Sequence, residues 1–288
     1  MKTYYYVHTG HRIGLDRFRR ATTILRALGD SDITLLTSDF RIAHISRDYG
    51  VENCVGIDVV RNIPQIAHHG DKLIFDSDEA NPLMLEDMRK FFSSFIRISD
   101  DENDTKEKGE FLISPYLEGE DICTTYAVDE KYFGDFKKST KLSFFFGDDD
   151  YEKDLEKNLD FLDGLENTLG LGFYYFLDYE DMLKDKFKKV FEFEEYDEMI
   201  TSSEILLTSS PQAVLESLAS GGKPIYFQRE DYTENFNKLF DKLNIPIIQN
   251  YNKEQLSVIL DTINNIKYQK LENNSNKTTH FIKEILNS

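Results

Sequence analysis

Apolar strand-like runs alternate with amphipathic helical stretches along almost the whole chain of 288 residues. The first run, "TYYYVHTG", precedes a stretch from about Gly14 to Leu28 in which apolar residues recur at every third or fourth position. This spacing gives a helix one apolar stripe, which can pack on a sheet. Strands that alternate with such helices are typical of parallel sheets covered by helices. The pattern therefore predicts the α/β class.

The same pattern restarts after a less regular region between residues 110 and 140. Here "KLSFFFGDDD" reads as a strand that ends in a turn, and "LGFYYFLDY", "EILLTS" and "KPIYFQRE" read as later strands. The chain is also longer than one ordinary domain of about 100 to 200 residues. We therefore expect two tandem α/β domains with mainly parallel sheets, one over residues 1–140 and one over residues 141–288.

Charge and cysteine content exclude several classes of protein. The net charge of −19 would repel a nucleic-acid backbone, and no apolar run approaches the ~18 residues of a membrane span. The two cysteines, Cys54 and Cys123, are too few for a disulfide framework or a zinc site. We expect a soluble cytoplasmic protein that does not bind nucleic acid and does not span a membrane.

Basic residues are concentrated at the start of the chain. Residues 1 to 28 contain six Lys or Arg residues and one acidic residue, Asp16. This segment could face an anion, or its arginines could line a solvated helix face. The loop before the basic helix, "HTGHRIG", offers His11 as a general base, against the alternative of a loop histidine that is bonded to the backbone.

Two further loops carry aspartates directly after apolar strands. They are "FDSDEANP", with Asp76 and Asp78, and "FFFGDDD", with Asp148 and Asp150. Paired carboxylates on a turn can bind Mg²⁺, but Asp is also common in solvated turns and at helix N-caps. We favour the turn and cap interpretation and expect no cofactor and no metal. Mg²⁺ held by Asp148 and Asp150 is the alternative, and a magnesium-dependent phosphatase is disfavoured because two strand-helix units precede "FDSDEANP".

A fourth loop, in "SSPQAVLESLASGGKPIYF", begins a short helix and places one acid within it. Pro211 suits the first position of a helix, so Ser209 and Ser210 lie where a cap or an anion contact is expected. Glu216 stands among small and apolar residues and therefore needs a hydrogen-bonding partner. We interpret the helix start as a site for a nucleotide diphosphate and Glu216 as a ligand of its ribose. Simple helix capping by the serines is the alternative, and it is compatible with that role.

The order of these motifs resembles that of GT-B-fold nucleotide-sugar proteins. The resemblance is strongest to the UDP-sugar hydrolases of pseudaminic acid biosynthesis, through "IGLDRFRRATTIL", "KLIFDSDE", "FIRISDDEND" and "FFFGDDD". The segments "SSPQAVLESLASGGKP" and "FQREDYTENFN" look more like MurG, the N-acetylglucosaminyltransferase of peptidoglycan synthesis. The resemblance implies two tandem Rossmann-like domains with an interdomain cleft.

The resemblance also implies roles for individual residues. Ser209 and Ser210 would meet the diphosphate, with Pro211 at the helix start and Gly147 in the nearby turn, and Glu216 would bind the ribose. Gln228 and Asp231 match the spacing of the donor-binding loop of MurG. Thr233 and Glu234 lie in the loop that would face the sugar.

The chain departs from the hydrolase pattern at two places. Where the hydrolases have a Gly-His-x-x-Arg motif, this chain has Asp16, Arg17 and Arg20. Arginine stays charged and cannot act as a base, so the base would be His11, with Arg17 and Arg20 stabilising the leaving diphosphate. Asp148 follows Gly147 in the diphosphate turn, where its charge opposes an anion.

We expect inverting glycosyl transfer from a nucleotide diphosphate sugar, with a UDP-sugar as the first candidate donor. The alternatives are a UDP-sugar hydrolase of nonulosonic acid biosynthesis and a catalytically silent homologue that binds a nucleotide sugar or a partner enzyme. The sugar, the acceptor and the oligomeric state are not encoded in any motif that we recognise.

Overall fold

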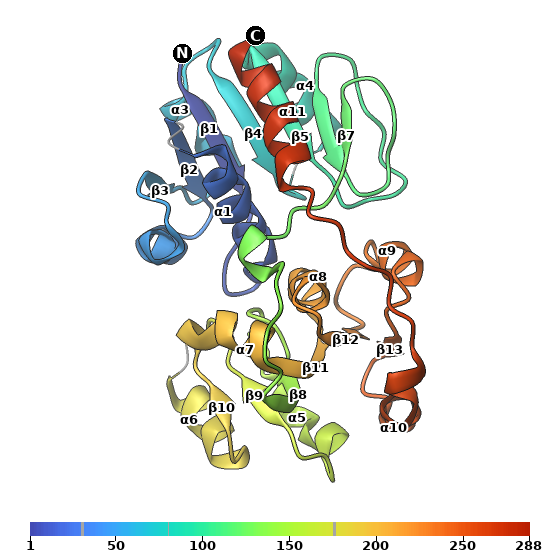
Figure 1. Cartoon of the computed structure of the whole chain (residues 1–288). Coiled ribbons are helices and arrows are strands. Elements are labelled where there is room, and N and C mark those ends of the chain that lie inside the picture. Colours follow the sequence, from blue (N-terminus) through green and yellow to red (C-terminus); the bar gives the residue numbers. More distant parts are fainter. Residues whose placement is uncertain (30–31, 80, 175–176) are drawn as a thin grey trace. The chain divides into compact units, whose positions relative to one another are not determined.

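The structure is a computed structural model that describes residues 1–29, 32–79, 81–174 and 177–288 (Figure 1). It divides the chain into two units. Unit 1 comprises Met1–Gly10, Arg17–Asp129 and Asn273–Ser288, and unit 2 comprises His11–Asp16 and Glu130–Glu272. The expected boundary lies between residues 140 and 141. In the structure the chain passes from unit 1 to unit 2 between Asp129 and Glu130, and the C-terminal segment from Asn273 belongs to unit 1.

Unit 1 is built on a parallel sheet of seven strands, counted over the described residues, in the order β3-β2-β1-β4-β5-β6-β7. The strands are β1 (Thr3–Val7), β2 (Ile33–Thr37), β3 (Cys54–Gly56), β4 (Lys72–Asp76), β5 (Ser94–Ile98), β6 (Phe111–Ser114) and β7 (Ile122–Thr124). Its helices are α1 (Asp16–Leu28), α2 (Phe40–Ile45), α3 (Ile63–Ile66), α4 (Pro82–Phe91) and α11 (Ser275–Asn287).

The central strands β1, β4 and β5 are largely buried, because helices cover both faces of a parallel sheet, whereas the edge strand β3 is mostly exposed. Tyr6 of β1 stacks on Phe75 of β4, with ring centroids 5.5 Å apart. Helix α11, red in Figure 1, packs beside β5 and β7, and its Phe281 makes an edge contact with Phe111 of β6. The amphipathic C-terminal segment therefore completes the core of unit 1.

Unit 2 contains a second parallel sheet, of six strands over the described residues, in the order β10-β9-β8-β11-β12-β13. The strands are β8 (Thr140–Phe145), β9 (Thr168–Gly170), β10 (Val190–Phe191), β11 (Ser203–Thr208), β12 (Lys223–Gln228) and β13 (Ile247–Gln249). The helices are α5 (Asp154–Lys157), α6 (Leu177–Lys186), α7 (Tyr196–Ser202), α8 (Pro211–Ala219), α9 (Asn237–Lys242) and α10 (Lys253–Thr262). Two parallel sheets with flanking helices confirm the predicted α/β class.

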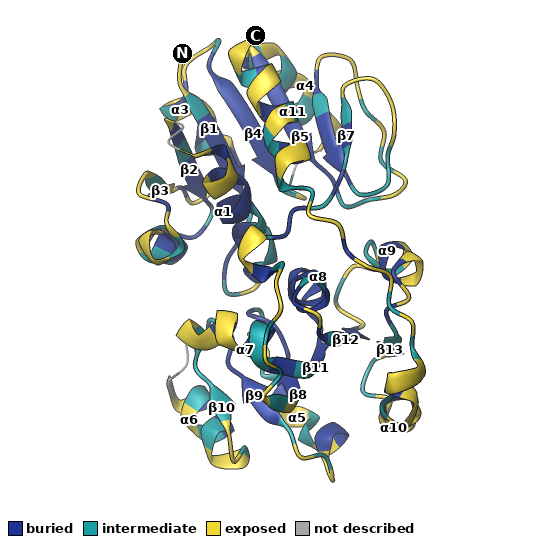
Figure 2. Ribbon diagram, in the orientation of Figure 1, coloured by how far each residue is buried: buried dark blue, intermediate teal, exposed yellow. Residues whose placement is uncertain are grey.

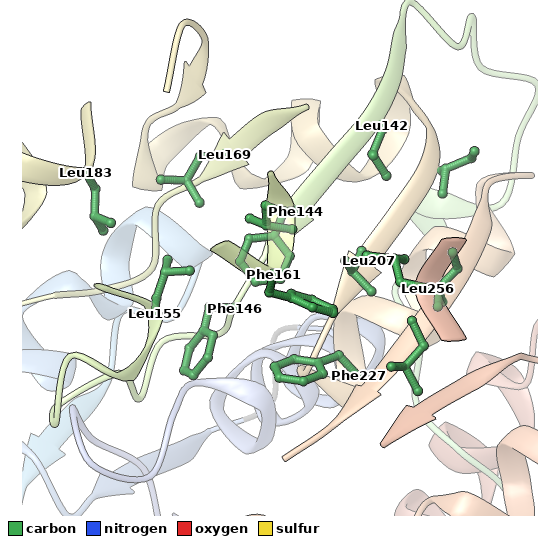
Figure 3. Close-up of a cluster of buried hydrophobic side chains, with 14 of the residues drawn as sticks. Leu142, Phe144, Phe146, Leu155, Phe161, Leu169, Leu183, Leu207, Phe227 and Leu256 are labelled. Carbon is green, nitrogen blue, oxygen red and sulfur yellow. The ribbon is translucent and has the colours of Figure 1, made fainter. Parts of the chain in front are cut away.

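On one face of its sheet, unit 2 has a hydrophobic cluster of aromatic and aliphatic side chains from five strands, β8, β9, β11, β12 and β13 (Figure 3). Phe144 and Phe227 are fully buried, and Phe161 stacks on Phe227 with centroids 5.5 Å apart. Helix α8 is buried along its first eight residues, unlike the partly exposed α10 (Figure 2). Its position explains why "PQAVLESLA" contains no basic residue.

One predicted strand is wrong in position, because the observed strand lies just before the predicted stretch. The sequence predicts a strand in "LGFYYFLDY", but the strand of this region is β9, which ends at Gly170, and α6 begins at Leu177. Residues 175 and 176 of the predicted strand lie outside the described residues. Beyond the end of β9 the backbone passes so close to the β8 loop that position 172 accepts only glycine, since a Cβ there would lie 2.1 Å from the carbonyl oxygen of Gly147.

The described helices also bear on the expectation that the chain does not span a membrane. None of them combines the length and the apolar character that crossing a bilayer requires.

Candidate functional site

Several of the predicted site residues follow strands at which the strand order reverses, whereas Gln228, Asp231, Thr233 and Glu234 lie at the end of β12 or in the loop after it. In unit 2 the order reverses between β8 and β11, and in unit 1 between β1 and β4. Loops that leave two neighbouring strands in opposite directions open a crevice at such a point, and ligands of doubly wound sheets bind there. The loops after β8 and β11 carry Gly147 and Ser209, and those after β1 and β4 carry His8 and Asp78.

In unit 2, the start of α8 is as the sequence predicts. Pro211 is its first residue, and the Ser210 side chain accepts a hydrogen bond from the backbone N–H of Ala213 at 3.1 Å. The helix therefore has the expected serine N-cap. The hydroxyl of Ser209 donates to the carbonyl oxygen of Phe146 and so ties the β11 loop to the β8 loop.

An internal carboxylate also contacts this helix start. Asp16 Oδ1 accepts a hydrogen bond from Ser210 Oγ at 2.6 Å, and its Oδ2 accepts one from the backbone N–H of Gln212 at 3.2 Å. Asp16 belongs to unit 2 with the rest of the loop His11–Asp16. A negative charge at a helix N-terminus is stabilised by the helix dipole and by the unpaired N–H groups there.

Glu216 lies inside unit 2, and its side chain is 1% exposed. Its Oε2 accepts from the hydroxyl of Tyr196 at 2.7 Å, and its Oε1 accepts from the amide of Gln212 at 2.9 Å. Both partners come from helices that pack on each other, α7 and α8. These bonds supply the partner that the sequence required, and the ribose role of Glu216 stays a prediction.

The aspartates after β8 are engaged with the protein. Asp148 Oδ1 accepts from the backbone N–H of Phe173 at 3.0 Å, and Asp150 Oδ1 accepts from that of Asp154 at 2.6 Å, at the start of α5. Asp150 thus accepts from the first N–H of α5 as a cap would, although the N-cap residue is Lys153, which makes no side-chain cap bond. Asp148 and Asp150 are both buried, so the expectation of solvated turn residues is wrong for them. Among the described residues, no cluster of three or more His, Cys, Asp or Glu side chains could hold a metal ion. Mg²⁺ binding by Asp148 and Asp150 stays an untested alternative.

The loop after β12 is organised by Arg229, which the sequence analysis did not select. Its guanidinium contacts Asp149 at 2.8 Å and Asp231 through Nε at 2.9 Å. Burial opposes the charge of Arg229, but Asp149 and Asp231 outweigh this effect and raise its pKa above the usual range. Asp231 therefore positions Arg229 in this structure.

The other predicted residues of the β12 loop are held by backbone contacts. The amide of Gln228 donates to the carbonyl oxygens of Arg229 and Tyr232, at 2.9 and 3.0 Å. Thr233 Oγ1 accepts from the backbone N–H of Asn235 at 3.2 Å, and Glu234 follows it in the same loop. No contact described here tests their sugar-binding roles.

In unit 1, Arg20 is the centre of a buried charge cluster. Its guanidinium donates twice to Asp76, at 2.6 and 2.9 Å, and once to Asp100 at 2.6 Å. Burial opposes the charged form, but Asp100 and Asp76 outweigh it, so the pKa of Arg20 lies well above its usual range. Asp76 is thus neither a solvated turn residue nor a helix cap, because it pairs with Arg20. The predicted phosphate role of Arg20 would require a guanidinium already bound by two carboxylates.

Arg17 is the second predicted cation, and it lies beside a histidine that the sequence analysis did not select. Arg17 donates to Asp78 at 3.0 Å, and the other Asp78 oxygen lies 2.6 Å from Nδ1 of His8. The hydrogen bond from His8, together with the charge of Arg17, holds the pKa of Asp78 well below its usual range despite partial burial. Both His8 and Asp78 directly follow strands that pair in parallel, β1 and β4, and this signal was available in the sequence.

His11, the predicted base, lies in unit 2. Its ring is 5.2 Å from that of Tyr151, centroid to centroid, and the guanidinium of Arg12 lies 3.9 Å above the same tyrosine ring. These contacts fix the loop His11–Asp16 to the segment that follows β8. The basic role of His11 stays a prediction.

Comparison with known proteins adds evidence on the fold. No family model matches the sequence, and no curated protein matches it. Solved structures do match over the whole chain. The UDP-GlcNAc 2-epimerase of Methanocaldococcus jannaschii in complex with UDP-GlcNAc and UDP is 13% identical, with 100% of each chain covered and a TM-score of 0.64.

Two further structures are similar at comparable identity. MurG of Acinetobacter baumannii is 11% identical, with 100% of each chain covered and a TM-score of 0.57. HepE of Anabaena in complex with UDP and glucose is 11% identical, covers 100% of this chain and 94% of its own, and has a TM-score of 0.58. At these identities the likeness concerns the fold, and the specific resemblance to pseudaminic acid hydrolases stays a prediction. The two parallel α/β units of this chain form the GT-B fold.

Proposed function

We propose that the protein is a GT-B enzyme that binds a nucleotide diphosphate sugar and transfers its glycosyl group to an acceptor hydroxyl. A UDP-sugar is the first candidate donor. One observation carries the proposal: in each unit, the polar residues that could do this chemistry lie at the reversal of strand order, which is where ligands of such sheets bind.

Unit 2 is proposed to bind the nucleotide. The start of α8 has hydroxyl and backbone donors, on Ser209, Ser210 and Gln212, that would bind phosphate oxygens after these displace the present acceptors, Phe146 O and Asp16. Glu216 follows on the same helix and carries the carboxylate that a ribose diol would require. In this assignment the hydroxyl of Tyr196 and the amide of Gln212 hold the carboxylate until the ribose competes for it.

Unit 1 is proposed to supply the general base. His8 and Asp78 form a histidine–carboxylate pair, in which the carboxylate orients the ring. His8 would take the proton of the acceptor hydroxyl as that oxygen attacks the anomeric carbon. His11 is the alternative base, and water as acceptor would give the hydrolase reaction.

A catalytically silent nucleotide-sugar protein is the second candidate. Two observations favour it: Asp16 contacts the start of α8, and Asp148 lies in the turn after β8. Both carboxylates oppose the negative charge that develops on the diphosphate as it leaves, so they hinder turnover more than binding. This candidate predicts binding without turnover.

The test combines turnover with binding. Purified protein is incubated with UDP-, GDP- and CMP-sugars, and released nucleotide is measured. We expect release from one donor class, and we expect His8→Ala to lower kcat by about 10²-fold or more with UDP binding unchanged, since a general base contributes about 10²- to 10⁴-fold. His44→Ala, an exposed histidine of α2, is the matched control. Full activity of His8→Ala together with inactivity of His11→Ala would transfer the role to His11.

Binding is measured by the thermal shift that UDP produces, since a ligand that prefers the native state raises Tm. Glu216→Ala should abolish the shift. Binding without release of any nucleotide would favour the silent protein, and the absence of both binding and release would reject the proposal.

A further inference from the structure

The donors in the first turn of α8 are all used within unit 2. Pro211 has no backbone N–H. The N–H groups of Ala213 and Val214 donate to the side chain and the carbonyl oxygen of Ser210, both at 3.1 Å. The remaining N–H, that of Gln212, donates to Asp16. A phosphate arriving at this helix start would therefore find its position held by the carboxylate of Asp16.

Asp16 is held in this position by the loop that precedes it. Arg12 and His11 both pack against Tyr151, and Gly14 adopts a positive φ of 86° close to Asp149. A side chain at position 14 would be strained in that conformation. The loop thus delivers Asp16 to α8 through contacts that lie within unit 2.

The charged groups near Asp16 do not offset its negative charge enough to favour binding of a phosphate. Asp149, which follows Asp148 on the β8 loop, lies close to Gly14; of the two nearby cations, Arg229 is already paired with Asp149 and Asp231, and Arg12 lies over the ring of Tyr151. A diphosphate would add at least two negative charges at the start of α8, beside these acids. Repulsion between like charges at short range in a partly buried site is strong enough to decide which ligand binds.

We propose that Asp16 determines the ligand specificity of this site, by occupying the phosphate position at the start of α8 with the chain's own carboxylate. This inference rests on the proposed function, because it concerns the same nucleotide site. While Asp16 is bound to Ser210 and Gln212, unit 2 discriminates against ligands with a phosphate at α8. A nucleotide diphosphate binds only when Asp16 leaves.

The test compares UDP with uridine, which has the same base and ribose but no phosphate. Affinities of both for the full chain are measured by calorimetry, without divalent cations, in the wild type and in Asp16→Asn. The variant keeps a side chain that can accept one of the two hydrogen bonds but removes the charge. We expect the Kd for UDP to fall about tenfold or more, and the Kd for uridine to stay within about twofold. Asp163→Asn, at an exposed turn of unit 2, is the control and should change neither value.

The outcomes separate this inference from the proposed function. If the wild type binds UDP and Asp16→Asn binds it no more tightly, Asp16 does not determine specificity, although the site remains a nucleotide site. If the affinities for uridine and UDP rise by the same factor in Asp16→Asn, the effect comes from general loosening of the loop, and the inference is also wrong. If neither protein binds either ligand, the proposed function fails and the inference fails with it. Thermal unfolding of each variant without ligand shows whether Asp16→Asn is folded, and Asp16→Ala repeats the comparison with a second side chain.

Discussion

Replacing Tyr196 by Phe tests whether the buried carboxylate of Glu216 depends on donors from within unit 2. The substitution removes the hydroxyl that lies 2.7 Å from Glu216 Oε2 and leaves the ring in place. The edge contact between this ring and Phe145, with centroids 5.5 Å apart, is therefore retained and no large cavity forms. The loss is one hydrogen bond to a carboxylate that is 1% exposed.

The magnitude follows from that geometry. A hydrogen bond to a charged group contributes about 1.5–3 kcal/mol, and Glu216 is too deeply buried for water to replace the lost hydroxyl. We expect Tyr196→Phe to lower the free energy of unfolding by about 2 kcal/mol, which corresponds to a fall in Tm of roughly 4–8 °C for a unit of this size. Urea unfolding followed by circular dichroism measures the loss, with an unchanged m-value as the sign that only stability has changed.

Tyr226→Phe is the matched control. The hydroxyl of Tyr226 is buried and has no hydrogen-bond partner among the described residues, so its removal should leave stability unchanged or raise it. A loss below about 0.5 kcal/mol for Tyr196→Phe, or equal losses for the two variants, would show that Glu216 does not depend on Tyr196.

Two further predictions concern the pH dependence of Asp78 and the close approach at Gly172. Because the folded-state pKa of Asp78 is lowered, its contribution to stability is present above its ordinary pKa of about 3.9 and is lost as the pH falls through the folded-state value. Asp78→Asn should therefore lower the free energy of unfolding at pH 7 and by less at pH 3, whereas equal losses at both would contradict the pKa assignment. A Cβ at position 172 would lie 2.1 Å from Gly147 O and 3.0 Å from the Cα of Asp148, so Gly172→Ala should cost about 2 kcal/mol or more in urea unfolding. Gly164→Ala, where no atom lies within 4 Å but φ is +84°, measures the backbone strain alone, and a smaller loss for Gly172→Ala than for this control would refute the steric argument.

Patterns within a short stretch of sequence were sufficient to predict helices and strands whose buried residues follow a regular spacing. The run "TYYYV" forms β1, the three-to-four spacing up to Leu28 forms α1, and Pro211 begins α8. These features depend on helix capping and on which face of an element is apolar, and both can be read from a few neighbouring residues.

Features that depend on distant contacts were not predictable in the same way. The aromatic run after Gly170 looks like a strand, yet Phe173 packs on Phe193 with centroids 4.9 Å apart, and backbone of the β8 loop approaches Gly172 closely. The amphipathic pattern of α11 shows that one face is buried but does not say against which sheet. For this reason the predicted second domain included residues 273–288, which the structure assigns to unit 1.

The candidate site shows the same limit. Glu216 was identified as a buried acid that requires a partner, but Tyr196 lies 20 residues away on another helix. The contact between Asp16 and Ser210 spans 194 residues, and no local rule predicts it. The His8–Asp78 pair is different, because both residues follow strands that a parallel sheet of this class places side by side.

The return of α11 to unit 1 sets an order for folding during translation. The long segment of unit 2 ends at Glu272, so a ribosome has synthesised it completely before α11 is made. Until then, unit 1 lacks the helix whose Thr278, Ile282 and Ile285 are buried, and the sheet surface beside β5 and β7 that α11 covers stays open. Unit 1 therefore closes only after its last helix has left the exit tunnel, and by then the whole of unit 2 has left it too.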